Sequence, residues 1–191
     1  MVMRKVGFYA GAFDPVHDGH IEVARSALKY LDLDVVYFLV EEMSWTDKQP
    51  EDVAHRKAMV DLAIADLPSV QQLDMKDQQF SIAKTLKDIE TQFPDNQLFF
   101  LFGADVFLRM NPQQWPGLDK LLKHNIVVFE RKDTTESAIT EHAKNIATSL
   151  AILPSVHPHH SSTDVRLNIH HKSLWVPQKI VAYIERQSLY A

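Results

Sequence analysis

Short apolar runs alternate with longer amphipathic segments along the sequence, and this alternation constrains the fold more than any other feature. Such a pattern predicts βαβ units, in which helices cover both faces of a parallel sheet. The runs that we expect to form strands are residues 5–10, 34–40, 70–73, 97–105, 125–131 and 149–154. The segments that we expect to form helices are residues 19–31, 51–67, 81–91, a stretch after Ser162, and residues 177–186. The sequence therefore predicts an α/β fold, with one doubly wound domain over residues 1–191.

Composition excludes several functional classes. The chain has no cysteine, which removes disulfides, thiol nucleophiles and cysteine zinc sites together. Its formal net charge is −5, which argues against nucleic-acid binding by bulk electrostatics. No apolar run approaches the roughly 20 residues needed to cross a bilayer, and the first residues do not have the pattern of a signal peptide. We therefore expect a cytoplasmic protein that binds neither membrane nor nucleic acid.

The segment GAFDPVHDGH (residues 11–20) joins the first predicted strand to the first predicted helix. The first βα loop of an open parallel sheet is the usual phosphate site. Gly11 lets a phosphate or ribose approach the backbone, and Gly19 allows tight packing at the helix start. His17 and His20 are three residues apart, which places both imidazoles on one side of the first turn, at the positive end of the helix dipole. The segment therefore predicts an anion site.

A second segment, SSTDVR (residues 161–166), has the composition of a helix start. Ser162 or Thr163 is expected to be the N-cap, with Asp164 in the first turn. Arg166 in that turn opposes the helix dipole unless an anion lies between its guanidinium and the exposed backbone amides. Because the planar fork of arginine suits phosphate oxygens, the segment predicts a second phosphate contact.

These two segments, in this order, resemble the GxFDPxHxGH and ISSTxxR motifs of the nucleotidyltransferase superfamily of adenylyl- and cytidylyltransferases. The resemblance implies a Rossmann-like fold and a reaction without a covalent enzyme intermediate. It places His17, His20 and Arg166 in catalytic positions around the triphosphate of ATP. Mg²⁺ would be held largely by phosphates and water, so no protein ligand to the metal is expected. The nucleotide-binding positions that it implies in the two motifs are Gly11, Ala12, Phe13, Asp14, Gly19, Ser161, Ser162 and Thr163.

Nearly the whole chain also resembles the bacterial nicotinate mononucleotide adenylyltransferases. FGADVF (residues 102–107) looks like the G-x-D turn of that family, which adds Gly103 and Asp105 to the implied nucleotide site. Trp115 stands where the family has a tryptophan near the pyridine ring, and the ending VPQKIVAYIERQSLY resembles the family's last helix and terminus. The resemblance implies transfer of AMP from ATP to the 5′-phosphate of a pyridine mononucleotide in NAD biosynthesis, with release of pyrophosphate.

The half of the site that would bind the acceptor departs from that family. Residues 41–52, EEMSWTDKQPED, form an acidic loop that we expect at the surface, where the family has a P-P-H-K-like stretch. Residues 80–82, FSI, replace its S-Y-T. The expected acceptor-binding residues are Trp115, Ile82 and Glu41. Since a carboxylate near the ring would repel nicotinate, a neutral nicotinamide or another phosphorylated acceptor is a second interpretation.

Other interpretations stay open. A protein that binds nucleotides without catalysis could keep both motifs, and a homo-oligomer is compatible with the sequence. A zinc site is a further alternative, and its ligands would be His17, His20, His157, His159 and His160. We also expect Arg56 to be a solvated helix residue. The histidines expected at the surface, without a role, are His124, His142, His170 and His171.

Overall fold

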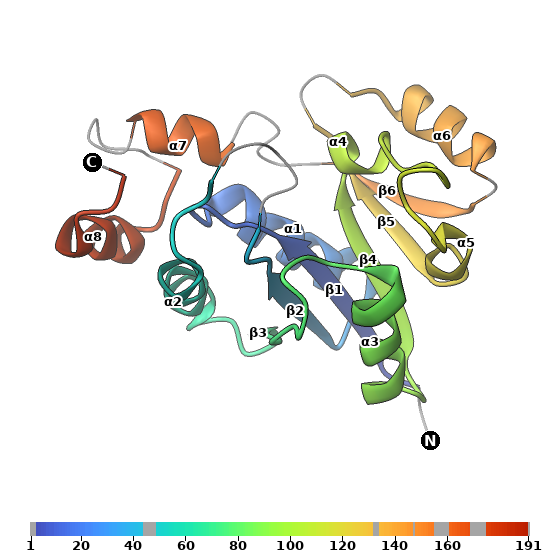
Figure 1. Ribbon diagram of the computed structural model, residues 1–191, viewed down its shortest axis with the longest axis horizontal. Helices are drawn as coiled ribbons and strands as arrows, with labels where there is room; N and C mark the ends of the chain where they lie inside the picture. The colour runs from blue at the N-terminus through green and yellow to red at the C-terminus, as the bar shows by residue number, and fades with distance from the viewer. Residues whose placement is uncertain are drawn as a thin grey trace.

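Six parallel strands form one sheet in the computed structural model, in the order β3–β2–β1–β4–β5–β6 (Figure 1). The structure describes residues 3–43, 49–131, 134–146, 148–154, 161–168 and 175–190. The strands are β1 (Lys5–Gly11), β2 (Val35–Val40), β3 (Val70–Gln72), β4 (Gln97–Gly103), β5 (Asn125–Phe129) and β6 (Leu150–Leu153). Every pairing between these neighbours is parallel. This order confirms the predicted Rossmann-like, doubly wound sheet.

Helices cover both faces of the sheet because its central strands are apolar on both sides. In β5, Val127 and Phe129 belong to one core, whereas Ile126 and Val128 belong to the other. The first core packs under α1 (Asp18–Leu31), α2 (Val53–Ile64), α7 (Ser162–Asn168) and α8 (Gln178–Gln187). The second core packs under η1 (Ile82–Leu86), α3 (Lys87–Gln92), α4 (Ala104–Phe107), α5 (Leu118–Leu121) and α6 (Glu136–Asn145).

Helix α6, which links β5 to β6, was not predicted from the sequence. Its buried side chains are only Ile139 and Ala143, one turn apart, so its periodic signal is weak. Thr135 caps its start, where the hydroxyl oxygen accepts a hydrogen bond of 3.2 Å from the backbone N–H three residues on. The helix predicted over residues 81–91 also differs, because it opens with the π-helical turn η1 before α3 begins.

The direction of winding changes between β1 and β4. The chain leaves β1 through α1, over the first core, and enters β4 from α3, over the second core. Connections that diverge in this way leave a crevice beyond the carboxyl ends of the two strands. The register pairs Tyr9 with Leu101 and Gly103 with Phe129, so the ends of β1, β4 and β5 lie side by side at this crevice.

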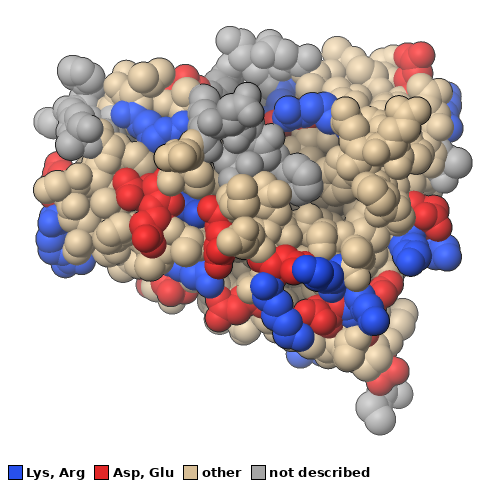
Figure 2. All heavy atoms as spheres, viewed as in Figure 1, with Lys and Arg blue, Asp and Glu red and all other residues tan. Residues whose placement is uncertain are grey.

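Acidic and basic side chains are interspersed over the lower half of the face shown in Figure 2, and neither sign dominates it. This mixture agrees with the small net charge of −5. Within the part of the chain that the structure describes, no helix combines the length and the apolar character needed to span a membrane.

Candidate active site

A cavity of about 220 Å³ lies at the crevice between the carboxyl ends of β1 and β4. Its wall includes these residues singled out from the sequence: Gly11, Ala12, Phe13, His20, Glu41, Gly103, Asp105 and Trp115. It also includes three polar side chains that sequence reasoning missed, Tyr9, Arg109 and Arg131. The fold therefore brings the first loop, the G-x-D turn and the tryptophan to one hollow.

Of the two motif histidines, His20 lines this cavity and His17 lies behind it. His17 is the buried N-cap of α1, and Gly19 is buried in the first turn that follows. The two imidazoles stack with their centroids 3.7 Å apart, while the ring of Phe13 meets His20 edge-on at 5.0 Å. The Nδ1 atom of His20 accepts the backbone N–H of His17 at 3.2 Å, which leaves the ring proton on Nε2.

The electrostatic surroundings keep His20 neutral. Burial, the neighbouring His17 and the positive charge of Arg131 together lower the pKa of His20 well below its usual 6.5. At pH 7 the ring therefore offers one N–H donor, and a bound polyanion would raise its pKa by favouring the charged form. The position suits a group that donates to a phosphate oxygen.

Two arginines and one carboxylate follow β4 and β5 at the rim of the cavity. The carboxylate of Asp105 lies 3.7 Å from Arg131 Nε and 3.7 Å from Arg109 NH2. Gly103 makes room for this group, since a Cβ at residue 103 would lie 2.6 Å from Asp105 Oδ1. Arg131 could have been identified from the sequence, because it is a basic residue shortly after β5, the strand next to β4. These cations give the cavity two sites for phosphate oxygens.

Arg56 is fully buried, so the expectation of a solvated helix residue is wrong. Its guanidinium donates from NH1 to the carbonyl oxygens of Ala12 at 2.6 Å and Glu41 at 2.5 Å. It donates from NH2 to the carbonyl of Glu42 at 2.9 Å, and from Nε to that of Glu51 at 2.6 Å. One side chain thus ties the first loop, the end of β2 and the start of α2 together.

The expected surface loop begins inside the molecule. Glu41 is 2% exposed, and its Oε1 accepts the backbone N–H of Phe80 at 2.9 Å in the cavity wall. Trp115 also lines the wall, where it meets Phe102 edge-on at 6.4 Å. Ile82, the third expected acceptor residue, is instead buried in the second core, outside the described lining of the cavity. Residues 44–48 of the predicted loop lie outside the described residues.

The second motif forms the start of α7, with a different cap from the one predicted. Ser161 is the N-cap, because its Oγ accepts the backbone N–H of Asp164 at 3.1 Å and lies 2.6 Å from that residue's carboxylate. Ser162 is the first helical residue, and its hydroxyl donates to the carbonyl of Pro15 at 3.0 Å. This bond joins α7 to the first loop.

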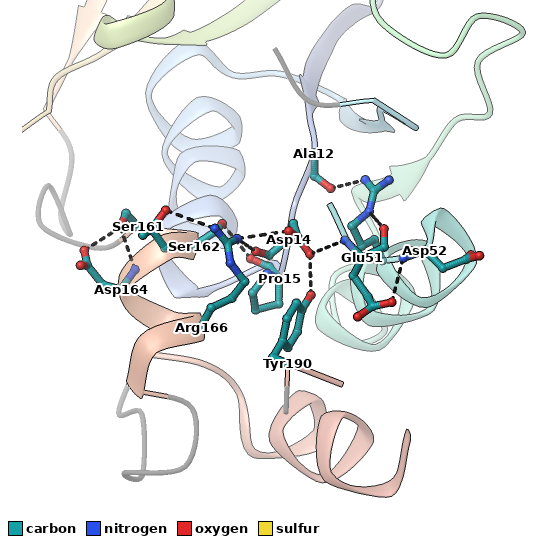
Figure 3. A network of polar contacts seen from close by, with 12 residues as sticks. Ala12, Asp14, Pro15, Glu51, Asp52, Ser161, Ser162, Asp164, Arg166 and Tyr190 are labelled. Atoms are coloured by element: carbon teal, nitrogen blue, oxygen red, sulfur yellow. Dashed lines mark hydrogen bonds and ion pairs between the residues drawn. The ribbon is translucent and has the colours of Figure 1, made fainter. Parts of the chain in front are cut away.

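Arg166 points from α7 to the same loop (Figure 3). Its NH1 donates to the carbonyl oxygen of Asp14 and lies 3.2 Å from that residue's Oδ2, while NH2 donates to Thr163 Oγ1 at 3.3 Å. The side chain of Arg166 is 24% exposed, and no acceptor for its Nε is found among the described residues. Arg166 lies in the last turn of α7 rather than in the first turn as predicted, and the anion beside it in the structure is the carboxylate of Asp14.

The structure does not assemble a metal site from the residues it describes. No group of three or more His, Cys, Asp or Glu side chains converges among them. His124 Nε2 lies 2.9 Å from Glu90 Oε1, and His142 Nε2 lies 3.0 Å from the carbonyl oxygen of Met110, so each has a partner within the fold. The histidines that fall outside the described residues are His157, His159, His160, His170 and His171.

Comparison with known proteins agrees with this geometry. Residues 8–168 match the family described as Cytidylyltransferase-like. A probable nicotinate-nucleotide adenylyltransferase of Clostridium botulinum is 32% identical over 200 residues, which cover 98% of each chain. The nicotinate-nucleotide adenylyltransferase of Bacillus subtilis is 30% identical over 98% of this chain and 99% of its own.

Among solved structures, the nicotinic acid mononucleotide adenylyltransferase of Plasmodium falciparum, complexed with NaAD, superposes with a TM-score of 0.82. The match covers 98% of this chain and 97% of that chain at 16% identity, and it supports the fold. The chain belongs to the cytidylyltransferase-like family, in the group of the nicotinate-nucleotide adenylyltransferases.

Proposed function

We propose that the protein transfers AMP from ATP to the 5′-phosphate of nicotinate mononucleotide, a step of NAD biosynthesis that releases pyrophosphate. The observation that carries this proposal is the single cavity that joins His20, Asp105 and Arg131 to the aromatic wall at Trp115. The first three suit a nucleotide and its phosphates, and an indole suits a flat pyridine ring. Relatives named nicotinate-nucleotide adenylyltransferase match 98% of this chain, which supports the same substrates.

The chemistry needs no nucleophile from the protein. An oxygen of the acceptor's 5′-phosphate attacks the α-phosphorus of ATP in line, the bond to the β-phosphate oxygen breaks, and pyrophosphate leaves with the electron pair. Positioning and charge neutralisation are the main sources of acceleration in such a transfer. Mg²⁺ enters with ATP as part of the substrate and neutralises charge on the phosphates.

The residues of the two motifs and the two arginines at the cavity rim have separate roles in this proposal. His20, in the wall of the cavity, donates a hydrogen bond from its Nε2–H to an oxygen of the reacting phosphate. Arg131 and Arg109 supply positive charge at the rim. Arg166, with the helix start at Ser162 and Thr163, holds the distal phosphates. His17 supports His20 from behind, through the stacked rings and the backbone hydrogen bond.

A second acceptor is favoured by one observation. Glu41 is a buried carboxylate in the same wall as Trp115, and a negative substituent on a ring stacked there would meet like charge. Nicotinamide mononucleotide, whose amide is neutral and can donate hydrogen bonds, avoids that repulsion. The protein is therefore proposed to use nicotinamide mononucleotide more readily than the family resemblance alone implies.

The test is an acceptor panel read by pyrophosphate release. Wild-type protein with ATP and Mg²⁺ is offered nicotinate mononucleotide, nicotinamide mononucleotide and phosphopantetheine, and we expect turnover with the two pyridine nucleotides. His20→Ala provides the background rate. Binding of ATP without release of pyrophosphate in the presence of any acceptor would refute catalysis and favour a nucleotide-binding protein. The proposal also includes the cytoplasmic location expected from the sequence.

A further inference from the structure

The carboxylate of Asp14 connects three distant parts of the chain (Figure 3). Asp14 is 8% exposed, and its Oδ2 lies 3.2 Å from Arg166 NH1. Its Oδ1 accepts the hydroxyl of Tyr190 at 2.7 Å and the backbone N–H of Glu51 at 3.3 Å. The shortest of these three contacts comes from the segment after α8, more than 20 residues beyond the second motif.

Tyr190 reaches Asp14 through an unusual backbone. Ser188, with a φ of 52°, is the usual left-handed cap at the end of α8, whereas Tyr190 has a φ of 59°, in the left-handed region that bulky side chains rarely adopt. Leu189 between them is buried in the first core. Such backbone strain is found where the surroundings fix a residue in place, often at functional sites.

The hydroxyl of Tyr190 keeps its proton under assay conditions. Burial, then the hydrogen bond and negative charge of Asp14, raise the pKa of Tyr190 above the usual 10.0 of tyrosine. The hydroxyl therefore remains a donor to Asp14 throughout the neutral range, and the contact does not depend on pH there.

Other contacts already hold α8 on the molecule. Tyr183 OH lies 2.8 Å from His55 Nδ1 on α2, and Lys179 Nζ lies 2.9 Å from Asp66. Ile180 and Ile184 are buried in the first core. These contacts anchor α8 independently of the bond from Tyr190 to Asp14. The position of that bond next to Arg166 points to another purpose.

We propose that Tyr190 is a positioning residue for the triphosphate of ATP, which acts through Asp14 on Arg166. Tyr190 fixes the carboxylate, the carboxylate fixes NH1 of Arg166, and the NH2 and Nε edge of the guanidinium is thereby turned to a phosphate. Without the hydroxyl, the one contact left to Oδ1 among the described residues is the long one of 3.3 Å to the backbone N–H of Glu51. The carboxylate can then rotate, and the guanidinium loses its fixed orientation. This inference rests on the proposed function, because it takes Arg166 as a phosphate ligand.

The test compares two substitutions that each remove one hydroxyl near α8. Tyr190→Phe should weaken ATP binding about five- to tenfold, measured as Kd by calorimetry and as KM for ATP. This lies just below the range for loss of a hydrogen bond to a charged group, since only part of the loss reaches Arg166. KM for the pyridine mononucleotide should stay within about twofold. Tyr183→Phe, the matched control, should leave both constants within about twofold, and thermal unfolding should show that both variants are folded.

A double-mutant cycle separates a positioning role from a structural one. In an Arg166→Ala background, Tyr190→Phe should have no further effect on the Kd for ATP, because the residue through which it acts is gone. An ATP affinity within twofold of wild type in Tyr190→Phe would overturn the proposal. So would an equal loss with and without Arg166, which would make Tyr190 only an anchor.

The same measurements distinguish this inference from the proposed function. If wild-type protein binds ATP and the Kd for ATP of Tyr190→Phe is the same, only the role of Tyr190 is refuted. Wild-type protein that neither binds ATP nor releases pyrophosphate refutes the proposed function and, with it, the role of Tyr190.

Discussion

Replacement of Arg56 should destabilise the protein more than any other single change to a charged helix residue considered above. The guanidinium is fully buried and donates to four carbonyl oxygens at 2.5–2.9 Å. A hydrogen bond to a charged group contributes about 1.5–3 kcal/mol, but four bonds from one side chain do not add, because water reaches part of the vacated space. We therefore expect Arg56→Ala to lower the free energy of unfolding by about 3–5 kcal/mol, because buried carbonyl oxygens left without a donor cost about 1–3 kcal/mol each and water satisfies some of them.

The assay is urea unfolding followed by far-UV circular dichroism, with thermal melting as a second readout. For a domain of this size, each kcal/mol corresponds to about 2–4 °C in Tm, so Arg56→Ala should melt roughly 10 °C lower. Arg56→Lys should recover less than half of the loss, because a compact ammonium cannot reach four acceptors spread over three segments. Arg25→Ala, on the exposed side of α1, is the matched control and should stay within about 0.5 kcal/mol. A loss below about 1 kcal/mol for Arg56→Ala, or full stability for Arg56→Lys, would refute the reasoning.

Four further predictions concern the proposed active site. His20→Ala should reduce kcat by about 10²–10³-fold with the fold intact by circular dichroism, since one donor to a developing charge contributes that much; near-normal kcat would leave His20 a structural residue. Because the pKa of His20 is lowered below 6.5, the unfolded chain takes up a proton first as pH falls, so wild type should lose stability between pH 7 and 5 faster than His20→Gln. Arg166→Lys should weaken ATP binding and leave acceptor binding nearly unchanged; the opposite pattern would place the triphosphate elsewhere. Glu41→Gln should raise kcat/KM for nicotinate mononucleotide more than for nicotinamide mononucleotide, and equal effects would show that its charge does not reach the ring.

The sheet was predictable because its signal is local. The segment QLFFLFG of β4 is apolar on both faces, which only a strand between two helical layers satisfies. The first loop was predictable for a similar reason, since it directly follows the first predicted strand and opens the first predicted helix, where His17 is the N-cap of α1. Helix α6 carries no comparable signal, because two buried side chains suffice to dock it.

The partners of buried charges could not be predicted in the same way. Arg56 looked like a solvated residue because a sequence shows that a side chain is charged but not what accepts its hydrogen bonds. Its acceptors are backbone carbonyls, which any residue supplies, and one of them, that of Ala12, is 44 positions away in the sequence. For Glu41, the sequence predicted a place in the acceptor site but also a surface loop, and it could not show that this carboxylate is buried with the backbone N–H of Phe80 as its partner.

Arg166 shows how a motif can point to one partner when the folded chain also supplies another. The sequence placed this cation in the first turn of α7 and predicted a phosphate as the anion that offsets it, but the residue lies in the last turn, where the helix dipole does not oppose it. In the structure that anion is Asp14, whose carboxylate is also held by Tyr190 and Glu51. These donors offset its charge, which limits repulsion of an incoming triphosphate, and the arginine is oriented before the nucleotide arrives. Pre-orientation reduces the entropy lost on binding, so the internal ion pair and the phosphate contact are complementary uses of one guanidinium rather than competing ones.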